Sequence, residues 1–452
     1  MQTGSYDSWH PPIHTFLIWL VTRIVDSYGF FIAVQVLFFG LMAGYMASTL
    51  RAWGIQPLWI ALFAAAIVST HSTRGMLLYA YKDSMFTCFA LWTAVCVVNI
   101  ALSRGEWLGK WGNRAGFAVS LAFTSTIRLN GFFFTIPIVL LLFLLYGKKQ
   151  AFSAAFSGGL ALLLVLGVRG PLYSAVGVKQ YAGQSHEEWI SSPMNILTSI
   201  YAVRPGALDE DGVRLMHWLA TPAQWAEGEV FFDNYMALKA RMCPPLPHMQ
   251  EEMDIFLEEY ASRSPLDKLL PTLWRAVKNE PALAVKALVH SSSSRWDPTA
   301  IQYTCDVSPE QLLWVTLDHP ALNEDLDNRL TGVHLRESVL AETKKPFYRI
   351  FQKFQAPYRA VEWVLRHLTP GSLLQCVGFH MLALAFCGWF SLRRRRGWGA
   401  LLLALPSFAY ILPTLPLIPG PNYRMFHFTV VITVPLVLVC LAKTPAAKPQ
   451  RK

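Results

Sequence analysis

The sequence predicts an all-α, polytopic membrane protein. Hydrophobic residues make up 53% of its 452 residues and the mean hydropathy is +0.33, which exceeds what a water-soluble chain of this length needs. The acids and bases are confined to short connectors and one long central stretch. These two observations indicate apolar helices in lipid, joined by polar connectors.

Nine apolar stretches are each long enough to approach the roughly 30 Å of a bilayer's hydrocarbon core. They are 28–50, 56–71, 84–103, 115–129, 132–147, 152–169, 372–391, 398–413 and 424–442. A single helix from Ala115 to Gly147 would be about 50 Å long, so this block is predicted to be a hairpin. Its turn is expected at "RLNG", Arg128 to Gly131, where a charge, an Asn and a Gly interrupt the apolar pattern.

The distribution of Lys and Arg predicts the orientation. Alternate connectors hold 14 bases and one acid, Glu106; the bases are Arg51, Arg104, Lys110, Arg114, Lys148, Lys149, Arg393, Arg394, Arg395, Arg396, Lys443, Lys448, Arg451 and Lys452. Such connectors are expected in the cytoplasm. The N-terminal tail and connectors 72–83, 128–131, 170–371 and 414–424 are then expected outside. The net charge of +10 reflects this topology, and no nucleic-acid partner is expected.

These expectations divide the chain into five parts. They are an external loop with an interfacial helix at 1–27, an N-terminal bundle at 28–169, an extracytoplasmic domain at 170–371, C-terminal membrane helices at 372–443 and a basic cytoplasmic tail at 444–452. The central part mixes amphipathic runs such as "HMQEEMDIFLEEYASR" with breaks such as "CPPLPH", which predicts a mainly helical domain. Five of the seven cysteines lie in spans. An oxidising compartment would favour a disulfide between the other two, Cys243 and Cys305, although sequence leaves open whether they meet.

The stretch "YDSWHPPIHT" gathers an acid and two histidines. A helix begun at Pro11 places His10 and His14 one turn apart, with Asp7 just before them. Metal binding or acid/base chemistry is one interpretation. The other is that Trp9 and the histidines lie at headgroup level and Asp7 caps the helix, and the spacing alone favours this second interpretation.

Further cations are expected at the outer face. Arg74 and Lys82 can hold a phosphate, or Lys82 can be a snorkelling anchor beside a helix-capping Asp83. Arg128, with Asn130 in the same turn, is costly without an anionic partner, either a protein carboxylate or a ligand.

A Pro-Gly-Pro turn brings Arg424 and His427 to the same face. Cations that converge at a lipid surface favour a lipid-linked phosphate over a soluble metabolite. The midplane charges and paired broken half-helices expected of a transporter are not evident.

The order of these motifs resembles the C-type (GT-C) glycosyltransferase superfamily. An acid precedes "HPP", "KD" opens a span, "RLNG" forms a basic hairpin, and a Pro-rich turn precedes an Arg and a terminal span. The span rhythm is similar to that of the aminoarabinose and protein-mannosyl transferase branch. The runs "LDEDGVRLMHWLATPAQWAEG" and "NEPALAVKALVHSSSSRWDP" look closer to largely uncharacterised bacterial members, and pilin glycosyltransferases are multi-pass members too.

The resemblance implies a GT-C-like helix bundle whose first family helix is missing from this sequence, because relatives cross the membrane once before the catalytic loop. Asp7 matches the catalytic acid of that loop, and Asp83 is a second candidate. Only one acid stands in "YDSWH", whereas many relatives carry two, so a bridging metal there is in doubt. The candidate phosphate ligands are Arg74, Lys82, Arg128 and Arg424, and the supporting residues are His10, His14, Asn130 and His427.

The implied activity is an inverting sugar transfer from a polyprenyl-phosphate donor, at the outer face of a bacterial cytoplasmic membrane. The acceptor would be a protein such as pilin, or a cell-envelope glycan or lipid. No cofactor is assigned, and a divalent cation is left open. Two alternatives remain at this point: a polysaccharide polymerase or ligase that takes a polyprenyl-diphosphate glycan, and a transporter or flippase without chemistry.

Overall fold

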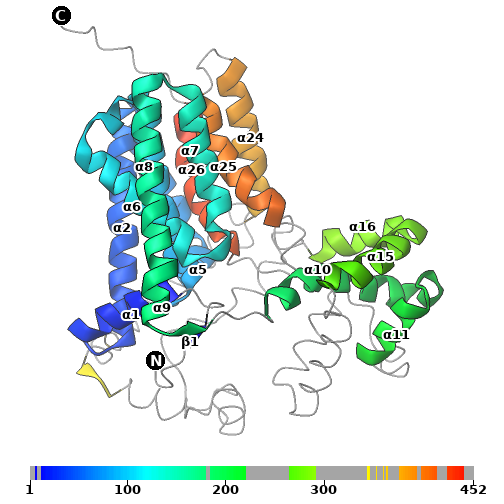
Figure 1. Ribbon diagram of the computed structural model, residues 1–452. Coiled ribbons are helices and arrows are strands. Elements are labelled where there is room, and N and C mark those ends of the chain that lie inside the picture. Colours follow the sequence, from blue (N-terminus) through cyan, green and yellow to red (C-terminus); the bar gives the residue numbers. More distant parts are fainter. Residues whose placement is uncertain are drawn as a thin grey trace, which may run out of the picture.

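The protein was analysed as a computed structural model (Figure 1), which describes residues 6–7, 12–179, 184–219, 264–291, 344–346, 376–393, 399–414 and 425–441 and four single positions between 353 and 364. The regular elements among these residues are helices apart from two short strands, β1 (Tyr6–Asp7) and β2 (Val178–Lys179). The predicted helical class is therefore confirmed for the part of the chain that is described.

Each apolar stretch forms a helix. These are α2 (Tyr28–Ala52), α3 (Pro57–Ser69), α5 (Lys82–Leu102), α6 (Trp111–Ile127), α7 (Phe132–Leu145), α8 (Lys148–Gly167), α24 (Val377–Arg393), α25 (Gly399–Thr414) and α26 (His427–Leu441). Three are long and apolar enough to cross a membrane, namely α2, α5 and α8 with its continuation to Ala175. The other six have 13 to 17 residues, so the count of nine spans stays a prediction.

Shorter elements connect and flank these helices. They are α1 (Pro12–Ile24), α4 (His71–Leu77), the 3₁₀ turns η1 (Glu106–Gly109), η2 (Leu129–Gly131) and η4 (Pro205–Ala207), the π-helical turn η3 (Val168–Leu172), α9 (Tyr173–Ala175), α10 (Gln184–Val203), α11 (Glu210–Leu219), α15 (Ser264–Asn279) and α16 (Pro281–Ser291). The predicted hairpin is confirmed, because α6 and α7 are separate helices joined at η2.

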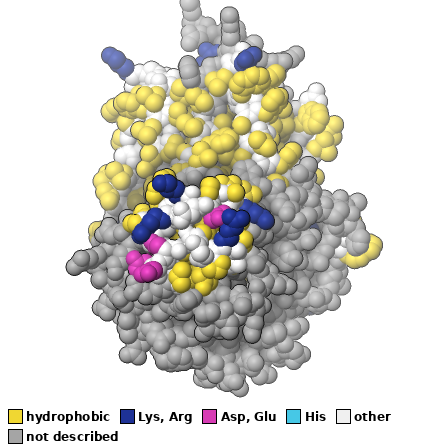
Figure 2. All heavy atoms as spheres, turned by 90° about the vertical axis from the view of Figure 1, so that its right-hand side faces the viewer, with side chains coloured by type: hydrophobic (Ala, Val, Ile, Leu, Met, Phe, Trp, Pro, Cys, Tyr) yellow, Lys and Arg dark blue, Asp and Glu magenta, His cyan; other side chains and the backbone are white. Residues whose placement is uncertain are grey.

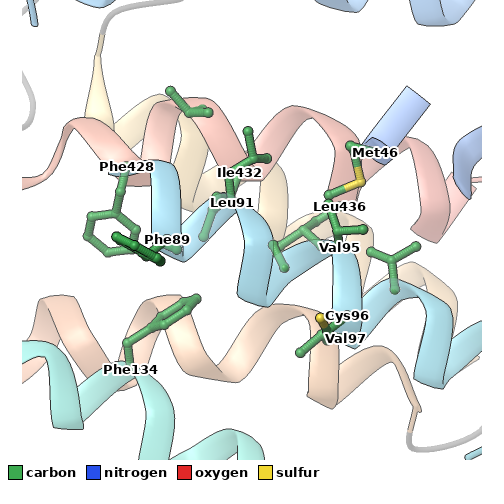
Figure 3. Close-up of a cluster of buried hydrophobic side chains, with 14 of the residues drawn as sticks. Met46, Phe89, Leu91, Val95, Cys96, Val97, Phe134, Phe428, Ile432 and Leu436 are labelled. Atoms are coloured by element: carbon green, nitrogen blue, oxygen red, sulfur yellow. The ribbon is translucent and has the colours of Figure 1, made fainter. Parts of the chain in front are cut away.

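The apolar helices share one hydrophobic core, although the central region separates them in sequence. Figure 3 shows Phe134 of α7 close to Phe428 of α26, whose rings meet edge to face at 5.6 Å. Leu91 of α5 and Ile432 of α26 extend the same contact along the bundle. The described parts of 28–169 and 376–441 therefore pack as parts of one bundle.

Connectors at both ends of this bundle contact its helices or one another. At one end, Gln35 Nε2 donates hydrogen bonds to the carbonyl oxygens of Leu77 and Tyr79, at 2.8 and 2.9 Å. At the other, Gly105 lies against the side chains of Gln150 and Tyr146. Figure 2 shows a largely hydrophobic surface along the bundle with Lys and Arg side chains at its upper edge. The end formed by 70–84, 125–131, 168–179 and 425–427 is called the site end below.

A second group of helices, α10, α11, α15 and α16, has its own small core around Leu197, Ile200 and Met216. It lies to the right of the bundle in Figure 1. An ion pair of 2.7 Å joins Arg275 of α15 to Asp209. Most described residues of the predicted outer domain are therefore helical. Cys243 and Cys305 lie outside the described residues, so their disulfide stays a prediction.

Candidate functional site

The site end contains a buried ion pair between Asp83 and Arg128. Arg128 Nη1 lies 3.1 Å from Asp83 Oδ1, and the two side chains are 5% and 1% exposed. The sequence left open whether a protein carboxylate or a ligand accompanies Arg128. The structure supplies a carboxylate from the neighbouring helix.

Local structure explains how the two charges meet. Asp83 occupies the first turn of α5, where the positive end of the helix dipole stabilises a carboxylate. Arg128 follows the last residue of α6 in an extended conformation, with φ −128° and ψ 141°, so the chain leaves the helix before it turns. The packing of α5 against α6 brings these two helix ends together.

The hairpin that holds Arg128 depends on a close approach at Gly131. A Cβ atom added there would lie 2.0 Å from the carbonyl oxygen of Thr124 and 2.9 Å from its carbon. Both atoms belong to the backbone and cannot turn away. Only glycine therefore fits at position 131, where η2 packs against the last turn of α6.

Gly131→Ala is expected to destabilise the protein by about 1 to 3 kcal/mol, because overpacked backbone must shift. The measurement is the free energy of unfolding in lipid bicelles. Gly112→Ala in the first turn of α6 is the control, since nothing lies within 4 Å of its added Cβ. It should be neutral or stabilising by about 0.5 to 1 kcal/mol. Equal effects of both variants would contradict this account.

Arg128 also joins α25 and α26 to the pair. Its Nη1 donates to the carbonyl oxygen of Met425 at 3.0 Å, and its guanidinium carbon lies 5.6 Å from the ring centre of Phe86. The Tyr410 hydroxyl donates to the same carbonyl at 3.4 Å. Arg128 is therefore fixed where four helices meet.

His427 lies fully buried at the start of α26. Its Nε2 is hydrogen-bonded to Thr73 Oγ1 of α4 at 3.0 Å, and its Nδ1 lies 3.4 Å from Thr87 Oγ1 of α5. These contacts attach α26 to α4, which precedes Asp83, and to α5, which contains it. The predicted supporting residue thus reaches the site end, whereas Arg424 lies outside the described residues.

The other predicted phosphate ligands are at the same end. Lys82 opens α5 and is half-buried; Arg74 of α4 is half-buried too, and its Nη1 donates to the carbonyl oxygen of Val68 at 3.0 Å. Asn130 lies in η2, half-buried, beside the hairpin turn. Three predicted cations and one amide therefore come from connectors that share one end of the bundle.

Asp7 belongs to β1, which pairs in parallel with β2 in the register Tyr6 to Val178 and Asp7 to Lys179. This pairing places the Asp7 backbone beside the segment that follows α9. Residues 8–11, between Asp7 and the described start of α1 at Pro12, lie outside the described residues, so a capping role for Asp7 stays untested. His10 lies outside the described residues. His14 is buried, and the centre of its ring lies 5.9 Å from that of Phe31 of α2 in an edge-on arrangement, so it packs against the bundle.

Sequence reasoning missed Arg169. It occupies the π-helical turn η3, and its Nη2 donates to the carbonyl oxygen of Ser125 in the last turn of α6 at 3.1 Å. Because an apolar run precedes it, Arg169 was interpreted as the last residue of the predicted span 152–169. Among the described residues, no three His, Cys, Asp or Glu side chains gather as metal ligands would.

No protein-family model, no curated protein and no solved structure matches this chain. Its resemblance to C-type glycosyltransferases therefore stays a prediction that depends on the motifs themselves.

Proposed function

We propose that this chain is a membrane glycosyltransferase that moves a sugar from a polyprenyl-phosphate donor to an extracytoplasmic acceptor. The observation that carries this proposal is the buried Asp83–Arg128 pair at the end of an otherwise apolar bundle. Ionisable groups in such surroundings are costly and mark functional sites. The backbone of Asp7 and the cations Lys82 and Arg74 come to the same end.

The chemistry needs a base on one side of the sugar and cations on the other. The acceptor oxygen attacks the anomeric carbon, the bond from that carbon to the phosphate oxygen breaks, and the acceptor proton passes to Asp7. The configuration inverts, and the polyprenyl phosphate leaves with both electrons of the broken bond. Because a phosphate monoester is a weak base, cations stabilise this leaving group better than a proton donor does.

Lys82, Arg74, Arg128 and Arg424 would contact the departing phosphate. The contact to Asp83 refines the role of Arg128, since a planar guanidinium has five N–H donors and Asp83 and Met425 lie at its Nη1. The N–H groups on the other nitrogens would donate hydrogen bonds to a phosphate oxygen while Asp83 holds the plane of the group. Asp83 would then be a positioning residue for Arg128, and a divalent cation is not required by this scheme.

This proposal includes nine spans in a bacterial cytoplasmic membrane, with the site end facing outward. The charge bias of the connectors supports that orientation. The helices α10, α11, α15 and α16 would border the acceptor. Membrane lipid and the acceptor protein or glycan are the expected partners.

The test compares surface glycans and glycoproteins by mass spectrometry with and without the gene. One acceptor should lose a sugar of defined mass, and the purified chain in liposomes should restore it from the polyprenyl-phosphate sugar alone. Consumption of only a diphosphate-linked glycan would instead indicate the polymerase or ligase alternative. Donor that crosses the bilayer chemically unchanged would indicate the transporter, and either result rejects the proposal.

A further inference from the structure

An apolar cavity of about 300 Å³ lies between α1 and the segment that follows η3. Phe16 and Trp19 contribute from α1, and Leu172, Tyr173 and Val176 contribute from the opposite side. This volume is at the lower end of the range of about 300 to 1,000 Å³ for ligand pockets, which are mostly apolar with a few polar groups. The cavity therefore has the size and lining for a hydrocarbon segment.

Arg169 stands beside this cavity. It precedes the lining residues Leu172 and Tyr173 by three and four positions, about one helical turn. Its Nη2 is anchored to the carbonyl oxygen of Ser125, while the residue as a whole is exposed. A guanidinium has five N–H donors in a fork that fits phosphate oxygens. π-Helical turns also occur frequently at functional sites.

The surroundings point to a lipid rather than a soluble anion. Arg169 follows α8, which is apolar enough to cross a membrane. Phe16 and Trp19 of α1 are 41% and 38% exposed and stack on each other, as aromatic side chains do at headgroup level. A free phosphate would gain nothing from the apolar lining, whereas a lipid phosphate uses both the cavity and the cation.

We propose that the cavity between α1 and α9 binds the hydrocarbon chain of a lipid phosphate and that the Arg169 guanidinium binds its phosphate group. The inference deepens the proposed function, on which it rests for the identity of the lipid as the donor. It adds a phosphate ligand that no motif indicated and assigns the hydrocarbon chain to the side of the bundle covered by α1. Arg169 and Arg128 are both attached to the last turn of α6, so the cavity adjoins the predicted phosphate ligands.

Binding to the purified full-length chain in nanodiscs tests this site with dodecyl phosphate, dodecanol and inorganic phosphate as probes. Arg169→Gln should weaken dodecyl phosphate binding about tenfold, the scale of one lost charge-assisted contact, and leave dodecanol binding unchanged. Val176→Trp should fill the cavity and weaken both. Lys148→Gln is the matched control, because it removes an exposed cation from the opposite end of α8 and should change neither.

A photoreactive dodecyl phosphate provides a second measurement that needs no variant. Cross-links should map to residues 12–19 and 172–178. Labelling elsewhere, unchanged affinity in Arg169→Gln, or equal affinity for inorganic phosphate and dodecyl phosphate would each overturn the inference. Arg169-dependent binding without any sugar transfer would keep the inference and reject the proposed function. If Arg169→Gln changes neither sugar transfer nor dodecyl phosphate binding, the inference is rejected and the proposed function is kept.

Discussion

Asp7→Asn is expected to lower the rate of sugar transfer by about 100-fold or more, which is the usual contribution of a positioned general base. The substitution keeps the size of the side chain and its hydrogen bonding but cannot take the proton of the acceptor hydroxyl. The loss should appear in the turnover rate at saturating donor, because the proposed mechanism has Asp7 contact the acceptor and not the phosphate. Transfer from the polyprenyl-phosphate sugar in liposomes is the measurement.

Asp26→Asn is the matched control for this variant. Asp26 is an exposed acid just after the other end of α1, where it forms a 2.9 Å ion pair with Lys345. Its loss should leave transfer within about twofold, because exposed pairs contribute about 1 kcal/mol or less to stability and none of that to chemistry. Donor binding should be equal in both variants. Full transfer activity in Asp7→Asn would reject Asp7 as the base.

Asp83→Asn is expected to lower the free energy of unfolding by about 3 to 5 kcal/mol, because it leaves the Arg128 charge buried without its carboxylate. The Arg128 side chain is 5% exposed, so water cannot replace the lost partner. Unfolding in lipid bicelles gives the stability, and binding of dodecyl phosphate to the surviving fraction reports whether Arg128 keeps its position.

Two comparisons separate charge burial from loss of the fold. Asp209→Asn breaks the more exposed pair with Arg275 and should cost about 1 kcal/mol or less. The double variant Asp83→Leu with Arg128→Met should recover much of the stability, since an apolar pair needs no charge compensation. Sugar transfer should stay lost in the double variant. A double variant as unstable as Asp83→Asn would contradict the burial argument.

Helices were predictable from this sequence, whereas contacts between them were not. Long apolar runs predict α2, α5 and α8, and the interruption at "RLNG" predicts the hairpin, because both signals are local. The partner of Arg128 depends on how α5 packs against α6, which no spacing within either helix records. The sequence therefore related Asp83 only to Lys82, its neighbour in the chain, and did not pair it with Arg128.

The weakest predictions concern the shortest elements. A strand of two residues has no alternating pattern, so neither β1 nor its pairing with β2 could be read from the sequence. Helical spacing made a capping role for Asp7 the favoured interpretation and gave no sign of the strand pairing. Arg169 was missed for a similar reason. A π-helical turn differs from the end of an α-helix in its backbone hydrogen bonding, which leaves no pattern in the sequence.

The shared core of the bundle also determines when the chain can be completed during synthesis. The ribosome releases α4 and α5 early, yet His427 and Phe428, which contact them, belong to α26, the last helix described. Until α26 arrives, the Thr87 hydroxyl lacks its histidine and Arg128 lacks the carbonyl of Met425. In the proposed membrane setting, a chain truncated before α24 is therefore expected to present polar groups to lipid, where each unsatisfied group costs several kcal/mol.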